Sequence, residues 1–403
     1  MENGAIKYMS VTAQNIITLA DQKFRDPNSS TAIGEAKKLN ALQEVLDDLN
    51  SDDVLPGSYR ETAIEYCDTL EEYPAPSDFK AFLDGEPENR FHDIDVVTPE
   101  AFRRRSNRQD SEMIAYDWKN DTRFILLKTN SDSRHITVHT LSSPTGNGTW
   151  AANTVDSDAT NVRQDNILSF KSNGAIAFDI DVSQSANNYA EISTTGLFGA
   201  VDLSDHNGLS SQLIDVYLPN ATNITSILLR WGSASGVYWE RTITTPANGG
   251  NWRSGKNQVR WDWEDATPTG SPSDTAIAYG LLRINYGASQ GDMNGVRISF
   301  WRSSPIEIVP VGYASSSIAK DTATPANFLQ SISSIEDVML FSGKNDSFRQ
   351  LVVFGVAAIL FDNRGNATDA LSKDTRYQEL KAKWSRIYPS RIKDAERSGS
   401  FYV

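Results

Sequence analysis

Nine tryptophans offer the most distinctive chemistry in this chain of 403 residues. The flat apolar face of an indole can stack on a sugar ring, and its N–H can donate a hydrogen bond. Six of the nine fall in one stretch of the sequence: Trp231, Trp239, Trp252, Trp261, Trp263 and Trp301. Tryptophans in strands more often pack in a core, and this interpretation is favoured for the set. Trp239 and Trp252, which stand beside predicted turns, are the better sugar-binding candidates.

Metal ligands are the second kind of chemistry to consider. Asp202, Asp205 and Asn207 could supply oxygens to calcium, but such a string also forms ordinary turns. The four histidines show no zinc-site spacing, and the single cysteine, Cys67, excludes both a thiolate cluster and an intrachain disulfide. The sequence therefore predicts no metal site and suits assembly in a reducing cytosol.

Catalytic patterns are also missing from the sequence. A glycosidase needs two carboxylates at a set separation, which the nearness of Asp262 and Glu264 in sequence does not establish. There is no GxSxG, Walker or Rossmann pattern to support nucleophilic, phosphate or dinucleotide chemistry. We therefore predict no catalytic residue, no cofactor and no enzymatic activity.

The net charge of -14 is concentrated near the start of the chain. Residues 1–100 hold 8 Lys and Arg against 21 Asp and Glu, which gives them -13 and leaves -1 for the rest. Such a field repels a phosphate backbone, so any DNA would pass without sequence-specific binding. The longest apolar run, Leu351–Phe361, is too short to cross a bilayer, and no leader pattern opens the chain, so neither a membrane partner nor classical secretion is expected.

Helical periodicity marks both ends of the chain. Apolar residues recur at three- and four-residue steps from Ile16 to Phe24 and from Ile33 to Leu49. A third helix is predicted from Pro56 to Leu70. Near the C-terminus the same period returns after Asp346 and again from Tyr377 to Ile387, which predicts two more helices.

The middle of the chain has a different pattern. Short β-branched and aromatic runs, separated by Gly, Asn, Ser and Pro, predict an antiparallel β-sandwich. The predicted strands are Ala175–Val182, Ser211–Leu218, Thr225–Trp231, Tyr238–Thr244, Gln258–Trp263, Tyr279–Asn285 and Val296–Trp301.

Each set of helices would leave its apolar faces exposed to water if it stood alone. Packing the N-terminal set against the C-terminal set buries the apolar faces of both. We therefore predict an α+β fold. A discontinuous multi-helix domain comprises residues 1–128 and 312–403, and an inserted sandwich of the jelly-roll type comprises residues 129–311.

Both predicted parts resemble known families. The helical parts resemble the head-to-tail adaptor (connector) proteins of tailed bacteriophages, through the stretches Thr12–Ile17, Asp26–Pro27, Leu39–Leu42, Tyr73–Phe79, Val353–Leu360 and Tyr377–Leu380 with Trp384. The β region resembles galactose-binding-like domains and carbohydrate-binding modules, through the stretches Ile224–Ser233, Tyr238–Thr244, Val259–Trp263 and Thr269–Pro272.

The adaptor resemblance implies a structural virion protein in the neck of a phage, assembled in the host cytoplasm. Copies would form a homo-oligomeric ring, usually a dodecamer, below the portal protein and above tail or nozzle proteins. DNA would pass through the ring during packaging and ejection, and the sandwich would point outward. The alternative is a carbohydrate-binding module or a glycan-active tail protein, with a glycan as partner.

Overall fold

The computed structural model describes residues 11–24, 33–51, 59–82, 94–105, 113–117, 123–127, 134–145, 148–153, 155–166, 174–321, 328–340 and 346–387. The chain divides into two compact units, and each is described by itself. We call them the helical unit, which comprises Met1–Thr62, Pro76–His92 and Pro310–Val403, and the sandwich unit, which comprises Ala63–Ala75 and Asp93–Val309.

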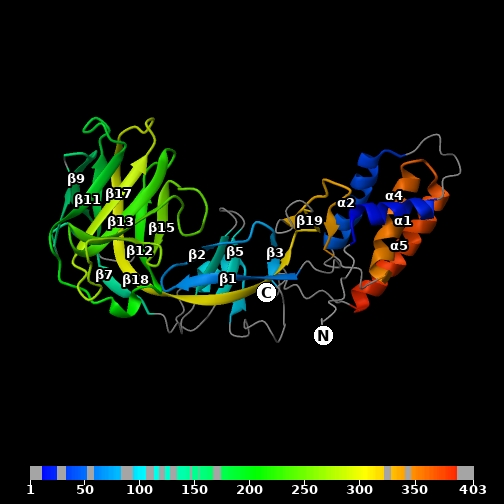
Figure 1. The fold of residues 1–403 in the computed structure, drawn as a ribbon, viewed down its shortest axis with the longest axis horizontal. Coiled ribbons are helices and arrows are strands. Elements are labelled where there is room, and N and C mark those ends of the chain that lie inside the picture. The colour runs from blue at the N-terminus through cyan, green and yellow to red at the C-terminus, as the bar shows by residue number, and fades with distance from the viewer. Residues whose placement is uncertain are drawn as a thin grey trace, which may run out of the picture. The chain divides into compact units, whose positions relative to one another are not determined.

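Four helices from the two ends of the chain share one hydrophobic core in the helical unit (Figure 1). They are α1 (Ala13–Phe24), α2 (Glu35–Ser51), α4 (Asp346–Asp362) and α5 (Ala367–Ile387). Helix α4 packs against the other three, which explains why it is apolar on nearly every side. Among the described residues, no helix is long and apolar enough to cross a membrane.

Gly355 allows the close packing of helix α4. A Cβ atom at this position would lie 2.9 Å from both Cγ atoms of Val45 on α2 and 3.0 Å from Cδ2 of Tyr377 on α5. Carbon atoms do not pack at these distances without displacing one another. The glycine therefore fixes how near the neighbouring helices can approach α4.

Asp78 lies at the centre of a polar cluster in the helical unit. Its carboxylate accepts hydrogen bonds from the hydroxyls of Tyr313, Ser315 and Ser317, at 3.0, 2.6 and 3.2 Å. It also forms an ion pair with Arg60 at 3.0 Å. Burial alone would raise the pKa of Asp78, but these hydrogen bonds and the charge of Arg60 outweigh it and hold the pKa below its usual value. Burial and the bond to Asp78 raise the pKa of Tyr313 to about 12.

The helical unit also contains strands. Its three-stranded sheet is formed by β20 (Phe328–Leu329), β19 (Ala319–Lys320) and β21 (Val338–Met339), and β3 (Phe79–Phe82) pairs with the end of β18 (Met293–Ser315).

The third helix predicted from Pro56 to Leu70 is wrong. Within the described part of this segment, strand β1 comprises Tyr59–Cys67, and a turn follows it. Ile64 and Tyr66 are buried, while Ala63 and Glu65 are exposed, which is the two-residue period of a strand. Apolar residues three and four apart suggested a helix, but the pairing of β1 with β18 decides the conformation.

The predicted fold class, a multi-helix adaptor domain with an inserted sandwich, is wrong. The described residues form 21 strands and five α-helices, so β-structure dominates. Residues 63–75 and 94–127, which the prediction placed in the helical domain, belong to the sandwich unit. The β-sandwich itself is confirmed.

Two antiparallel sheets form this sandwich. One sheet contains, in spatial order, β15 (Gly255–Asp262), β12 (Ser210–Leu218), β18, β10 (Ala175–Ile180) and β9 (Ala159–Asp165), with β7 (Ile136–His139) also paired to β18. The other contains β16 (Thr267–Thr269), β14 (Val237–Ile243), β13 (Ile224–Ala234), β17 (Tyr279–Tyr286), β11 (Tyr189–Gly196) and β8 (Thr149–Ala152). All seven strands predicted from the sequence are present.

The core between the two sheets is rich in aromatic side chains. Trp231, Trp261 and Trp301 are fully buried there. The indole of Trp261 donates a hydrogen bond to the carbonyl oxygen of Ile227, and that of Trp301 donates to Gln212. Most of the tryptophans in the sandwich therefore serve packing.

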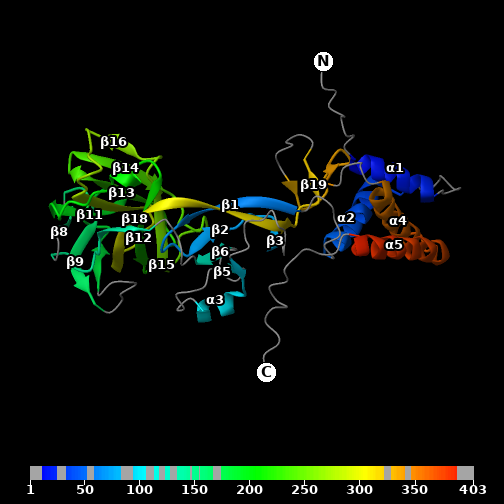
Figure 2. The same cartoon turned by 90° about the horizontal axis from the view of Figure 1, so that it is seen from below.

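A smaller sheet completes the sandwich unit (Figure 2). It contains β2 (Glu72–Pro74), β6 (Arg123–Leu127), β5 (Met113–Asp117) and β4 (Asp95–Val96), in that order, and helix α3 (Pro99–Arg105) packs against β5. The hydroxyl of Thr98 accepts a hydrogen bond from the backbone N–H of Ala101 and so caps α3. Two charged residues of this sheet, Glu72 and Arg123, pair with each other, and Glu72 also pairs with Arg253 in the loop between β14 and β15.

Candidate binding pocket beside Trp252

A pocket of about 410 Å³ lies at one end of the sandwich. It forms where residues 244–254, the loop between β14 and β15, meet residues 219–223, the turn between β12 and β13. The lining residues are Ala221, Thr222, Ile224, Thr244, Asn251, Trp252 and Ser254. This volume is within the range of pockets that hold small molecules.

The lining combines apolar surface with neutral hydrogen-bonding groups. Thr222, Thr244 and Ser254 supply hydroxyls, and Asn251 supplies an amide. Hydroxyls both donate and accept, and the amide offers two donors and an acceptor. None of the seven lining residues is charged or titratable. The pocket can therefore hydrogen-bond a polyhydroxylated ligand, but it has no group to neutralise a charged one.

Trp252 forms the aromatic part of the wall. Its ring packs partly against the sandwich core and is only partly exposed. The indole Nε1 is buried and has no hydrogen-bond partner among the described residues. The buried N–H is therefore not exposed to a ligand in the pocket.

Backbone hydrogen bonds to one buried side chain shape the loop after Trp252. Asn257, on β15, accepts a bond from the N–H of Arg253 at 3.1 Å and donates to the carbonyl oxygens of Arg253 and Gly255 at 2.8 and 3.1 Å. Asn257 is fully buried, so breaking this pattern would leave polar groups unpaired.

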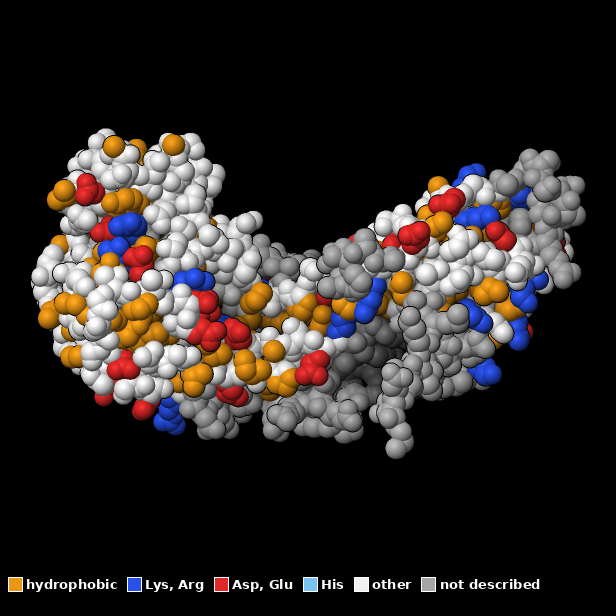
Figure 3. Space-filling view, in the orientation of Figure 1, with side chains coloured by type: hydrophobic (Ala, Val, Ile, Leu, Met, Phe, Trp, Pro, Cys, Tyr) orange, Lys and Arg blue, Asp and Glu red, His pale blue; other side chains and the backbone are white. Residues whose placement is uncertain are grey.

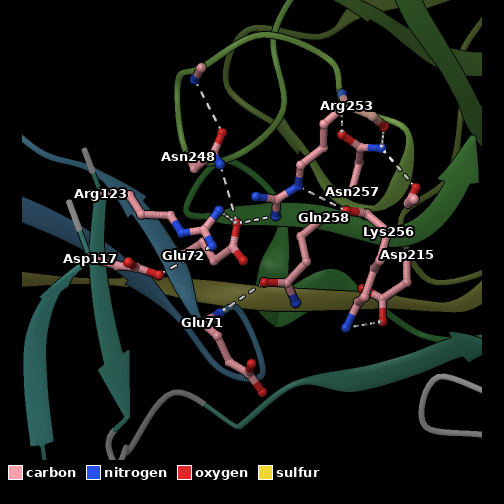
Figure 4. Close-up of polar contacts among 12 residues, drawn as sticks. Glu71, Glu72, Asp117, Arg123, Asp215, Asn248, Arg253, Lys256, Asn257 and Gln258 are labelled. Atoms are coloured by element: carbon pink, nitrogen blue, oxygen red, sulfur yellow. Dashed lines mark hydrogen bonds and ion pairs between the residues drawn. The ribbon is translucent and has the colours of Figure 1, made fainter. Parts of the chain in front are cut away.

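Charged residues hold the same loop from the small sheet (Figure 4). Glu72 Oε2 accepts hydrogen bonds from Arg253 at 2.5 Å, from Asn248 at 3.2 Å and from Arg123 at 2.9 Å. Arg123 in turn lies 3.6 Å from the buried carboxylate of Asp117. Since charge-assisted bonds are stronger than neutral ones, Glu72 is a firm anchor for the loop.

The opposite wall is a tight turn joined to the loop. Asn220 accepts hydrogen bonds from the N–H and the hydroxyl of Thr222, at 3.0 and 2.8 Å. The N–H of Ala221 donates to the hydroxyl oxygen of Ser254 at 3.3 Å, which connects the two walls directly. Hydrogen bonds within the protein therefore hold both walls of the pocket together.

The second sugar-binding candidate, Trp239, lies elsewhere. It is 9 % exposed and belongs to the sandwich core. Its ring meets that of Trp263 edge to face, with centroids 5.1 Å apart. The structure therefore separates the two candidates, since only Trp252 lines the pocket.

The pocket residues Thr222 and Asn251 were not predicted from the sequence, and neither was Glu72, which lies outside the lining and bonds to the loop. Residues with hydroxyl or amide side chains are common in turns, so their presence alone does not indicate a binding pocket. The run Asn248-Gly249-Gly250-Asn251 does mark an unusual turn.

The segment considered for calcium forms a short 3₁₀-helix, Ser204–His206, followed by a turn. Asp202 accepts a hydrogen bond from the N–H of Ser204 at 3.0 Å, and Asn207 donates to Asp274 at 3.0 Å. Within the described ranges, no group of three or more His, Cys, Asp or Glu side chains is arranged to hold a metal ion.

The comparison with known proteins yields structural likenesses alone. No family model matches the chain, and neither does any curated protein. Similar solved structures include the family 30 carbohydrate-binding module of a Clostridium thermocellum cellulosomal cellulase, with 7% identity and a TM-score of 0.29 over 42% of this chain and 96% of that one. The family 11 module of the cellulosomal cellulase Lic26A-Cel5E from the same organism has 10% identity and a TM-score of 0.28, over 44% and 97% of the two chains.

A viral protein is also among the similar structures. Tailspike protein 4 of bacteriophage CBA120 has 13% identity and a TM-score of 0.27, over 43% of this chain and 22% of the tailspike chain. These identities and TM-scores do not indicate a ligand or an activity for this chain. Nothing in these comparisons supports the predicted adaptor role.

The ring of copies, the portal and tail partners, the passage of DNA, the virion location and the lack of enzymatic activity stay predictions. No contact among the described residues tests them.

Proposed function

We propose that this protein binds a neutral glycan in the pocket beside Trp252. The observation that carries the proposal is the composition of this one pocket. An aromatic ring is combined there with three hydroxyl side chains and an amide, and no charged group lines the cavity.

The chemistry of a sugar fits this combination. A pyranose has one face of C–H groups, which packs on an aromatic ring, and a rim of hydroxyls, which need donors and acceptors at its edge. Trp252 would supply the apolar contact, and Thr222, Asn251 and Ser254 would supply the hydrogen bonds.

The charges of the sandwich unit support a neutral ligand. Arg230 pairs with Glu240, Arg297 pairs with Asp165, and the arginine of the loop pairs with Glu72. The face of this unit seen in Figure 3 carries mostly uncharged side chains, with basic and acidic groups interspersed. An acidic glycan would find no unpaired cation among the residues that line the pocket.

The test is a printed array of neutral and acidic oligosaccharides, followed by calorimetry with the strongest binder. We expect binding to a neutral glycan. Trp252→Ala should abolish it, and Trp252→Phe, which keeps a flat ring, should retain part of it. Tyr189→Ala, which removes a partly exposed aromatic residue on β11, is the matched control and should bind normally.

Two results would contradict the proposal. One is an array on which the wild-type protein binds nothing. The other is a folded Trp252→Ala variant with undiminished affinity for the same glycan.

A further inference from the structure

The segment that carries Trp252 is held at both ends by a single carboxylate oxygen. Glu72 Oε2 accepts a hydrogen bond from Asn248, where the segment begins, and from Arg253, where it ends (Figure 4). Between these anchors lie only two glycines, then Asn251 and Trp252. Adjacent glycines have unusually high conformational freedom, so this segment depends on its anchors for a single shape.

A second contact joins the same segment to β2. Gly249 has a φ of +74°, and a Cβ atom there would lie 3.0 Å from the Cβ of Pro74. Pro74 and Glu72 are both on β2. One strand of the small sheet therefore contacts the loop through a charge and through close packing.

The carboxylate of Glu72 is itself held in place. Arg123, on the neighbouring strand β6, donates to it at 2.9 Å, and the two side chains are 7% and 20% exposed. Asp117, on β5, lies on the far side of this guanidinium. A line of alternating charges thus runs from β5 through β6 and β2 to the loop.

We propose that Glu72 is the positioning residue of the Trp252 pocket, and that the small sheet is a working part of the binding module. This inference rests on the proposed glycan binding. Without the carboxylate, the loop samples other shapes, and a ligand must then select the competent one. Affinity falls even though Glu72 lines no part of the pocket.

The test compares the full chain with its Glu72→Gln variant, which keeps size and removes charge. Hydrogen exchange is measured on peptides covering residues 244–254, without ligand. Binding is measured by calorimetry with the oligosaccharide that gives the strongest array signal. Asp165→Asn, which removes the carboxylate that pairs with Arg297 on another part of the sandwich, is the matched control.

We expect Glu72→Gln to speed exchange in the loop and to weaken binding by about tenfold or more, since it loses charge-assisted bonds. Asp165→Asn should change neither quantity. Arg253→Gln should weaken binding and speed loop exchange as Glu72→Gln does. The double variant should lose clearly less binding free energy than the sum of the two single losses. A residue that only stabilised the fold would give additive losses and leave loop exchange at the wild-type rate.

The outcomes separate the two proposals. Wild-type exchange and wild-type affinity in Glu72→Gln would overturn the positioning role while leaving glycan binding intact. Faster loop exchange in the variant, with no glycan bound by the wild type, would overturn glycan binding while leaving Glu72 as the anchor of the loop.

Discussion

Gly249 lies directly against Pro74, with only 3.0 Å between the Pro74 Cβ and the place a side chain on Gly249 would begin. The glycine also has a positive φ, which other residues adopt at a cost of about 1–2 kcal/mol. Residues 175 positions apart in the sequence therefore fix one shape of the pocket loop.

Gly249→Ala should lower the free energy of unfolding of the sandwich unit by about 1–3 kcal/mol, because backbone strain and the clash with Pro74 add together. Urea unfolding followed by tryptophan fluorescence measures the loss. Gly236→Ala is the control, since a Cβ there meets no atom within 4 Å, and it should stay within about 0.5 kcal/mol of the wild type. Equal losses of stability in Gly249→Ala and Gly236→Ala would contradict the close packing of Gly249 against Pro74.

Trp239 and Trp252 should respond differently to replacement. Trp239→Ala leaves a cavity beside Trp263 in the core and should cost about 3–5 kcal/mol of stability. Trp252→Ala removes a partly exposed ring and should cost less. Thermal unfolding of both variants makes the comparison. A larger loss for Trp252 than for Trp239 would show that their burial has been assigned the wrong way round.

Gly355→Ala tests the packing of α4. Alanine is favoured over glycine inside a helix by about 1 kcal/mol, so propensity alone predicts stabilisation. The added Cβ would meet Val45 and Tyr377, and overpacking costs about 1–3 kcal/mol. We expect net destabilisation of the helical unit, measured by urea unfolding followed by circular dichroism in the helical band. A rise in stability would mean that the neighbouring helices move apart easily.

Asp78 should make the helical unit sensitive to acid. Its pKa is held below the usual value in the folded state, so its contribution to stability is complete above the unfolded pKa of about 4 and is lost as the pH falls through the lower folded pKa. Asp78→Asn should lose about 1–3 kcal/mol at neutral pH and should show a shallower decline below about pH 4. Unfolding curves recorded from neutral to acidic pH, for wild type and variant, make the measurement. If the stability of the wild type and of Asp78→Asn fell equally with pH, the lowered pKa of Asp78 would be contradicted.

Local patterns were enough to predict much of the sandwich. In the segment Gln258–Trp263, Val259 and Trp261 alternate with polar residues, and the structure buries both in the core. A strand with one buried face must show this alternation, so the pattern can be found without knowing its partners. The helices α1, α2, α4 and α5 were also predicted correctly, because their apolar residues recur at helical spacing.

The same kind of pattern failed for β1. Tyr59, Ala63 and Tyr66 have helical spacing, yet the segment is a strand, because pairing with β18 satisfies its backbone. Its partner comes more than two hundred residues later, so no local window contains the deciding interaction.

The binding pocket shows this limit most clearly. The sequence by itself determined that a tryptophan-rich antiparallel sandwich would form and that Trp239 and Trp252 stand near turns. Only the tertiary structure decided that Trp239 faces the core and Trp252 the pocket, and that Glu72 anchors the loop. The physical reason is that burial and ion pairing depend on which distant segments meet, and Glu72 and Arg253 are 181 residues apart.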